Sequence, residues 1–451
     1  MTISDCRLSN EKRSPCAILS LMRSGWAWQR GAQAFLLLAV ILSLAPVARP
    51  YSVLTHEQIV DLAWEVQIQP MLLKRFPRST PEDLKKAHAY AYGGCMLQDM
   101  GYYPFGNKYF SDLVHYVRSG DYVLALLEES TDLDEYAFAL GALAHYASDN
   151  SGHPTINRVT AIEFPKLRKK FGDSVTYAQD PKAHIRTEFG FDMVQVAKNR
   201  YTSDRYHDFI GFEVSQALME RAFEKTYGIC LDDVFDDLDL AVGSFRHAVS
   251  KIIPEMTKVA LISRRDVIVS ETPNFDKKKF LYYLSRTSYE KDWGTKYRRP
   301  GIGARILAFL FKSIPKFGPL NALDFKIPSK QAEDMYIKSV DQTVEDYSGL
   351  LKKVRAGSIE LPNRDFDTGK NTLAGEYVLT DRTYAHLVDD LAKRNFEQVT
   401  PELRANILQF YSNLNAPIAT KKDKKEWARV LEELDKLRSG KMETAPPAPA
   451  K

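Results

Sequence analysis

The stretch from Asp134 to Ser148, DEYAFALGALAHYAS, decides the fold class. It is apolar on nearly every face of a helix, which is typical of a helix buried at the centre of a protein. His145 stands inside it and Asp149 follows directly after it. Polar side chains on a buried helix cost free energy unless they are paired or bind a metal. The stretch therefore predicts a central buried helix that carries a polar site.

Helical patterns continue on both sides of this stretch. Thr80-Pro81-Glu82-Asp83 predicts a helix start, with an N-cap, a proline in the first turn and acidic residues after it. Asp180-Pro181 shows the same helix-start pattern, and apolar residues with helical spacing follow it to about Asn199. Further helices are predicted over residues 212–227, 231–261, 330–353, 381–395 and 422–437. Strand-like alternation is scarce, so the chain is predicted to be all-α.

Length and composition exclude several classes of protein. The chain has 451 residues, and its hydrophobic fraction of 44% excludes wholesale disorder. Four cysteines exclude a disulfide scaffold. Residues 1–50 hold six of the 62 basic and two of the 58 acidic residues, so the rest carries 56 − 56 = 0. This neutral balance disfavours a protein whose main partner is nucleic acid.

The N-terminal region predicts export. The apolar run AFLLLAVILSL, residues 34–44, has the length of a signal-peptide core and is shorter than the roughly 20 residues that span a membrane. Small residues at Ser43, Ala45 and Ala48 predict cleavage near Tyr51. We expect a periplasmic or secreted protein, with membrane association as a further option. An uncleaved anchor is the alternative reading, and Met22 is an alternative start.

Composition divides the chain into five predicted parts. These are an N-terminal extension and signal peptide (1–50), an all-α domain (51–265), a connecting segment (266–328), a helical C-terminal region (329–440) and a disordered tail (441–451). The connecting segment holds an apolar, basic run over residues 301–320, which fits either a membrane interface or a buried hinge. Cys95 and Cys230 either pair or lie as small buried hydrophobes.

Histidines and carboxylates gather in the predicted all-α domain. His145 and Asp149 are four residues apart, as are His184 and Glu188, so each pair shares one helix face. His153 follows Asn150-Ser151-Gly152, which we expect to turn the chain back toward the site. A single histidine–carboxylate pair usually forms an ordinary hydrogen bond in a protein core. Two such pairs, together with His153, indicate a metal site. Nitrogen and oxygen ligands without cysteine suit zinc, and several carboxylates suit more than one ion.

Three more residues complete the candidate set. His56 lies in the segment YSVLTH, and Asp99 lies in GGCMLQDMGYYP, which we expect to end a helix and expose the carboxylate. His115 follows Asp99 by 16 positions. The aromatic residues after Asp99 predict either a wall for a lipid or a base, or ordinary loop packing: Tyr102, Tyr103, Phe105, Tyr109 and Phe110. The remaining histidines are expected to be structural or at the surface: His88, His207, His247 and His386.

In this order the set resembles the zinc-dependent phospholipase C superfamily, which also contains fungal single-strand-specific nucleases. Those proteins are all-α and hold three zinc ions. The matching positions, in chain order, are His56, Asp99, His115, His145, Asp149, His153, His184 and Glu188. The resemblance covers about residues 51–265 and none of the C-terminal region.

Two departures from the family pattern matter. Only three residues separate Asp149 from His153, a spacing similar to the glycosylphosphatidylinositol-specific phospholipase D branch. The family also uses its mature N-terminal residue as a ligand. Tyr51 occupies that place, but Pro50 is a poor residue before a cleavage site, which puts the third metal in doubt.

The resemblance implies Zn²⁺ as cofactor, with two or three ions. It implies one zinc at Asp99, His115, His145 and Asp149, a second at His153, His184 and Glu188, and a third at His56, the N-terminus and a bridging Asp149. Such ions neutralise phosphate oxygens and lower the pKa of a water toward about 7, which produces a nucleophile for phosphorus. Asp99 is the position at which the family places a candidate general base.

The predicted function is that of an exported zinc-dependent phosphodiesterase. A phospholipase of type C or D, hydrolysing phospholipids and contacting a membrane peripherally, is the first choice. A single-strand nuclease is the alternative enzyme, although phosphate-rich polymers usually meet a basic surface. A non-catalytic module stabilised by zinc is the alternative outside enzymes, but structural zinc sites are usually closed and often use cysteine.

Overall fold

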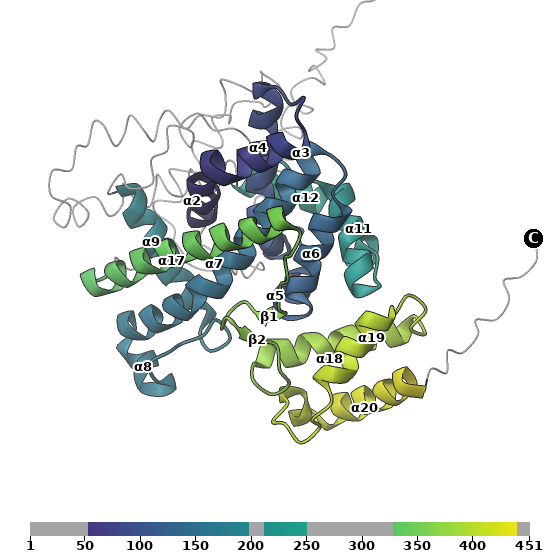
Figure 1. Ribbon diagram of the computed structural model, residues 1–451. Coiled ribbons are helices and arrows are strands. Elements are labelled where there is room, and N and C mark those ends of the chain that lie inside the picture. Colours follow the sequence, from purple (N-terminus) through teal and green to yellow (C-terminus); the bar gives the residue numbers. More distant parts are fainter. Residues whose placement is uncertain (1–52, 198–211, 250–327, 440–451) are drawn as a thin grey trace, which may run out of the picture.

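The computed structural model describes residues 53–197, 212–249 and 328–439. In these residues the protein is all-α apart from one two-stranded antiparallel hairpin, so the predicted fold class is confirmed. Figure 1 shows the long helix α7 in the middle of the molecule. Helices from both the N-terminal and the C-terminal parts pack against α7.

The elements of the N-terminal part are, in chain order, α2 (Val53–Ala63), the π-helical η1 (Trp64–Ile68), α3 (Gln69–Arg75), α4 (Pro81–Cys95), the 3-10 helix η2 (Leu97–Tyr102), α5 (Lys108–Tyr116), α6 (Ser119–Glu129), α7 (Leu133–Glu163), α8 (Pro165–Phe171), α9 (Pro181–Ala197), α11 (Gln216–Tyr227), η3 (Leu231–Asp233) and α12 (Leu238–His247). One continuous helix from residue 231 is a wrong prediction. The chain is interrupted after η3, and Asp237 starts α12 by accepting a hydrogen bond from the Leu240 N–H.

Helices α4 and α7 cross at very short range, and glycines on both helices make this possible. A methyl group at Gly94 would lie 1.9 Å from the Phe138 carbonyl oxygen, and one at Gly141 would lie 2.1 Å from that of Ala91. Real side chains do not approach backbone atoms so closely, so any larger residue would force the helices apart. The crossing brings the C-terminal end of α4 directly against the middle of α7.

Both predicted proline starts are confirmed. Thr80 accepts a hydrogen bond from the Asp83 N–H, and the Asp83 carboxylate accepts one from the Thr80 N–H, which completes a capping box at the start of α4. Asp180 accepts a hydrogen bond from the Ala183 N–H at the start of α9. These caps fix where α4 and the site-bearing helix α9 begin.

The C-terminal part consists of α17 (Lys330–Ala356), β1 (Arg364–Asp365), β2 (Lys370–Asn371), α18 (Val378–Lys393), α19 (Pro401–Phe410), the 3-10 helix η6 (Ala419–Lys422) and α20 (Lys424–Ser439). Figure 1 shows α17 lying alongside α7, which their direct contacts bear out. Among the described residues, one hydrophobic core contains members from both the N-terminal and the C-terminal parts, from Val53 to Leu437. Described residues on either side of the predicted domain boundaries therefore share one core.

The predicted turn after Asp149 is wrong. Helix α7 runs unbroken from Leu133 to Glu163, with Pro154 inside it. Packing on several sides of α7 outweighs the weak helix propensity of Asn150, Ser151 and Gly152. As a result His153 is presented by the same helix as Asp149, one turn further along.

Several predictions fall on residues outside the described ranges. They are the N-terminal extension and signal peptide, Tyr51, His207, the apolar run over residues 301–320 and the tail. Across the described part of the chain, no helix combines the length and apolarity that crossing a membrane requires. Cys95 is buried, Cys230 is half-buried, and neither is in a disulfide.

Candidate metal centre

Helix α7 carries the middle of the site. His145, Asp149 and His153 follow one another at intervals of four residues, so they lie along one face of the helix. The Asp149 carboxylate lies between the two imidazoles. Its Oδ2 is 3.0 Å from His145 Nε2, and its Oδ1 is 3.8 Å from His153 Nε2. All three side chains are fully buried.

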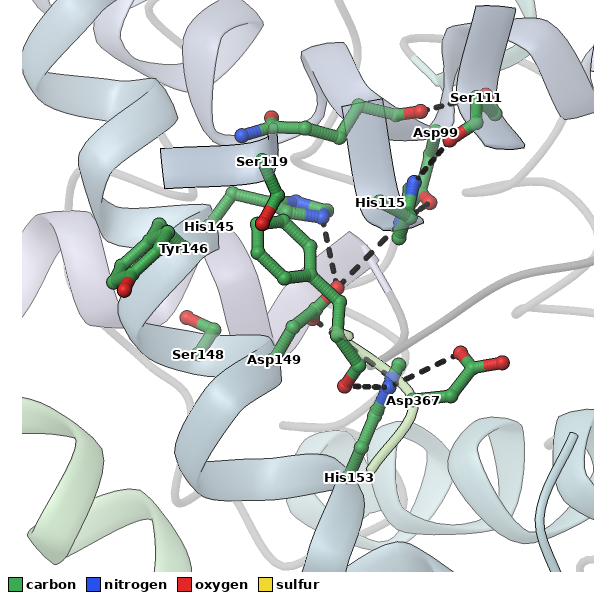
Figure 2. A network of polar contacts seen from close by, with 12 residues as sticks. Asp99, Ser111, His115, Ser119, His145, Tyr146, Ser148, Asp149, His153 and Asp367 are labelled. Carbon is green, nitrogen blue, oxygen red and sulfur yellow. Dashed lines mark hydrogen bonds and ion pairs between the residues drawn. The ribbon is translucent and has the colours of Figure 1, made fainter. Parts of the chain in front are cut away.

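Two other helices bring an imidazole to the same carboxylate, and η2 adds Asp99 beside one of these imidazoles. Helix α2 places His56 Nε2 3.6 Å from Asp149 Oδ1, and the His56 ring stacks on His145. Helix α5 places His115 Nε2 3.6 Å from Asp149 Oδ2 and 3.4 Å from Asp99 Oδ1 of η2. Figure 2 shows His115, His145 and His153 around Asp149. Asp149 is therefore the residue that connects the whole centre.

Helix α9 adds the remaining predicted pair. His184 Nε2 lies 2.8 Å from Glu188 Oε1, and the same oxygen is 3.5 Å from His153 Nε2. The structure thus brings together all eight described positions of the predicted set: His56, Asp99, His115, His145, Asp149, His153, His184 and Glu188. The expectation that Asp99 is exposed is wrong, because η2 folds beneath α5 and leaves Asp99 fully buried.

Backbone carbonyls fix the orientation of three of the imidazoles. The Nδ1 atoms of these rings lie 2.7 Å from Ser111 O for His115, 2.9 Å from Cys95 O for His145 and 2.9 Å from Phe366 O for His153. A carbonyl oxygen only accepts hydrogen bonds, so each Nδ1 must carry the proton. The Nε2 atoms, which face the centre, therefore present lone pairs.

These lone pairs face the lone pairs of other acceptors. Whether the acceptors have donors of their own decides whether the residues fit a metal ion. Both oxygens of the Asp149 carboxylate lack a hydrogen bond of ordinary geometry, and so do the Nε2 atoms of His115 and His145. This holds although these nitrogens lie 3.6 Å and 3.0 Å from Asp149 Oδ2. Acceptors crowded together in a buried place require a cation between them. The donors form three groups that each suit one ion: His56, His145 and Asp149; Asp99, His115 and His145; and His153, His184 and Glu188.

Burial keeps several of these groups uncharged in the absence of a cation. It lowers the pKa of His184 to about 4 and raises the pKa of Glu188 to about 8. Burial, followed by the neighbouring His145, also holds the pKa of His56 well below its usual range. Burial alone would raise the pKa of Asp149, but positive charge on the surrounding imidazoles, His145 first, holds it below its usual range, as a metal ion in their place would. Neutral imidazoles and an ionised bridging carboxylate are the forms that bind zinc.

A small cavity opens beside the centre. Its lining residues are Tyr102, His115, Tyr116, His153, Tyr177, His184 and Asp367. The aromatic residues after Asp99 were predicted either to wall a site or to pack in a loop, and the structure shows both: Tyr102 lines this cavity, whereas Tyr103 and Phe110 are packed in the core. Phe105 is 55% exposed.

Sequence reasoning missed Asp367, Tyr116 and Tyr177. Asp367 lies between β1 and β2, far along the chain from the other site residues, and no motif marks it. Two histidines expected to be structural are placed outside the centre, since His88 bonds to Asp61 and His386 stacks on Tyr109.

Comparisons with known proteins agree with this geometry. Residues 55–237 match the family model described as zinc dependent phospholipase C. Separate searches among curated proteins and among solved structures found no match. The matched residues include every described position of the predicted ligand set, and the family implies zinc as cofactor and phospholipid phosphodiesters as substrates in general. Residues 55–237 are therefore similar to the zinc-dependent phospholipase C family.

Proposed function

We propose that this protein is an exported phospholipase that hydrolyses the phosphodiester bond of phospholipids on the glycerol side, releasing diacylglycerol and a phosphorylated head group. The observation that carries the proposal is the convergence of four histidine Nε2 atoms within 3.8 Å of the Asp149 carboxylate, in a buried centre beside a cavity. A centre with this many nitrogen and oxygen donors and no cysteine suits an open catalytic cluster.

The donor set supports a particular division of work. Zinc held there would neutralise phosphate oxygens and lower the pKa of a water, which is the chemistry that phosphodiester hydrolysis needs. We assign Asp99, His115, His145 and Asp149 to one ion, His153, His184 and Glu188 to a second, and His56 with Asp149 to a third. Tyr51 would join the third ion if it is the mature N-terminus.

The chain's own residues have three further tasks. Backbone carbonyls hold the Nδ1 protons of His115, His145 and His153, so that their Nε2 atoms stay directed at the centre. The cavity between Tyr102 and Tyr177 is the route by which a phosphate group would reach His115 and His184, and its aromatic walls limit the entry of water. Asp99, 3.4 Å from His115 Nε2, is the proposed general base.

Product analysis tests the proposal. The full chain, loaded with zinc, is incubated with phosphatidylcholine in mixed micelles, and both water-soluble products are measured. Release of phosphocholine is expected, release of free choline would indicate type D cleavage, and degradation of single-stranded DNA without lipid hydrolysis would contradict the proposal.

The matched variants are His145→Ala and His88→Ala, since both residues are buried histidines bonded to acceptors. His145→Ala should remove hydrolysis while helicity by circular dichroism is retained. His88→Ala should retain hydrolysis. Parallel loss of fold and activity in His145→Ala would favour a structural role for the metal.

Export is a separate part of the proposal. It is supported by the apolar run over residues 34–44 and the small residues that follow it. Intact-mass measurement of the protein from the culture medium and periplasm should give a chain that begins near Tyr51. A chain that retains residues 34–44 and sediments with membranes would contradict cleavage and favour an anchor.

A further inference from the structure

Residues 361–371, here called the hairpin segment, lie outside the family match but are bonded to α5 and α7, which carry candidate ligands, and to α6. The contacts that anchor it are the Gly120 N–H to Asn363 Oδ1 at 3.0 Å, the Arg364 N–H to Ser119 Oγ at 3.0 Å, the Phe366 N–H to His115 O at 3.2 Å and the Tyr146 hydroxyl to Pro362 O at 2.8 Å. The segment is thus held by α5, α6 and α7 together.

Phe366 touches three of the candidate ligands. Its carbonyl oxygen accepts the Nδ1–H of His153 at 2.9 Å. Its ring packs edge-on against His115, with centroids 5.4 Å apart, and lies 6.1 Å from the ring of His145. The residue therefore supports His153 through its backbone and the two other imidazoles through its side chain.

Asp367 places a carboxylate on the other side of His153. Its Oδ1 is 3.6 Å from His153 Nδ1, an approach that Figure 2 shows, and it lines the cavity with His153 and His184. Its Oδ2 accepts hydrogen bonds from the hydroxyls of Tyr116 and Tyr377, which hold the carboxylate in place. Histidines that bind a metal commonly donate their second N–H to a carbonyl or carboxylate, and loss of that partner typically weakens binding by about 10–100-fold.

Gly369 lets the segment approach α7 at one weak point of the helix. Pro154 has no N–H, so the Asn150 carbonyl lacks its usual donor four residues on. A methyl group at Gly369 would lie 2.5 Å from that carbonyl oxygen and 3.0 Å from the Pro154 ring. Only glycine allows this approach, which keeps Phe366 and Asp367 against the turn that carries His153.

We propose that the hairpin segment is part of the metal centre, with Asp367 as a positioning residue: the Phe366 carbonyl holds the proton on His153 Nδ1, and the charge of Asp367, 3.6 Å from the same nitrogen, favours this orientation of the ring, in which Nε2 faces Asp149 and Glu188. The inference rests on the proposed function, because it concerns the same centre. It extends the centre to residues that the family match does not cover.

The first experiment compares Asp367→Asn with Asp381→Asn in the full chain. Both aspartates are buried in the C-terminal part, but among the hydrogen bonds described the Asp381 carboxylate accepts only from the N–H groups of Gly375 and Ala419, and it contacts no candidate ligand. Zinc affinity is measured by competition with a chelator, and fold by circular dichroism. Asp367→Asn should bind one ion about 10–100-fold more weakly than wild type. Equal affinities in the two folded variants would overturn the inference.

The second experiment moves the segment without changing any polar group. Gly369→Ala and Gly357→Ala both put a side chain at positive φ, 68° and 66°, but only Gly369 faces α7, whereas nothing lies within 4 Å of Gly357. The visible spectrum of the cobalt(II)-loaded protein should change in Gly369→Ala and stay as in wild type in Gly357→Ala. Identical spectra would overturn the inference, and this pair decides alone if Asp367→Asn does not fold.

Failure of the proposed function looks different. A folded wild-type chain that binds no zinc would overturn the proposed function. Full zinc binding by the wild type, with no difference within either variant pair, would overturn only the role of the hairpin segment.

Discussion

His88 and His145 are both buried histidines with a carboxylate oxygen close by, at 2.9 Å from Asp61 and 3.0 Å from Asp149 respectively. Around His88 the polar atoms are bonded to one another. The Asp61 carboxylate accepts from His88 and from the Tyr92 hydroxyl at 2.6 Å, and the His88 ring stacks on Trp64. Around Asp149, by contrast, imidazole lone pairs and carboxylate oxygens face one another without such bonds.

The difference lies in which groups supply the protons. Near His88, a ring N–H and a phenol donate to one carboxylate, so the cluster is complete as it stands. Near Asp149, backbone carbonyls accept the ring protons of His115, His145 and His153, so that their Nε2 atoms face the centre as acceptors. The partner of the second ring nitrogen therefore distinguishes the two clusters, because a carbonyl that accepts the ring proton leaves the other nitrogen available to a metal.

The largest effect is expected from exchanging one carboxylate in each cluster. Asp149→Asn should remove most bound zinc and reduce hydrolysis by about 10³-fold, which corresponds to several kcal/mol of lost transition-state stabilisation. Asp61→Asn should keep its zinc and lose about 1–3 kcal/mol of unfolding free energy. Elemental analysis and initial rates check both. Normal zinc content in folded Asp149→Asn would remove the distinction between the clusters.

The helix crossing beside the centre should give the next largest effect. In Gly141→Ala the new methyl group would lie 2.1 Å from the Ala91 carbonyl oxygen, so α4 must move, and the Cys95 carbonyl that orients His145 moves with it. We expect a loss of about 1–3 kcal/mol in unfolding free energy together with weaker zinc binding. Gly243→Ala is the control, since nothing lies within 4 Å and a gain of about 0.5–1 kcal/mol is expected. Urea unfolding measures both, and a stabilised Gly141→Ala would contradict the crossing.

Removing zinc should affect only one cluster. A bound ion at a free concentration 100 times its dissociation constant stabilises the folded state by about 2.7 kcal/mol. Chelation should therefore lower the unfolding free energy of the wild type and of Asp61→Asn by a similar amount, and that of Asp149→Asn by less, because only the group of His153, His184 and Glu188 does without Asp149. Thermal unfolding with and without chelator tests this. An equal shift in Asp149→Asn would place the ion elsewhere.

The smallest effect concerns pH and isolates His88. Burial lowers the pKa of His88 below its usual value of 6.5, even though Asp61 acts in the opposite direction. The unfolded chain therefore takes up this proton first, and the contribution of His88 to stability is complete above pH 6.5 and lost as pH falls toward the lower, folded pKa. In metal-free protein, His88→Gln should lose less stability than wild type on acidification below pH 6.5. Urea titrations across that range measure it, and parallel curves would contradict the shift.

The fold class and the grouping of the candidate residues could be predicted because both depend on helix geometry. Residues four positions apart must share a helix face, so His145 with Asp149 and His184 with Glu188 were paired by spacing alone. Their role as zinc ligands stays a prediction. The prediction of a turn after Asp149 is wrong because the local turn preference of residues 150–152 is weaker than the packing that surrounds α7.

The hairpin segment could not be predicted for a different reason. Its strands are two residues long, too short for any periodic pattern, and its partner residues lie far away in the sequence. Asp367 is one aspartate among many, and only the fold places it beside His153. Asp99 was expected at the surface for a related reason, since nothing local shows that α5 covers η2.

The hydrogen bond from His153 to the Phe366 carbonyl joins residues 213 positions apart. The ribosome makes the chain from the N-terminus, so every candidate ligand from His56 to Glu188 has been synthesised long before Phe366 exists. Contacts between distant parts of a chain also form slowly, because a long loop must close first. A nascent chain, or one truncated before Phe366, therefore carries every candidate ligand from His56 to Glu188 without the support that holds His153.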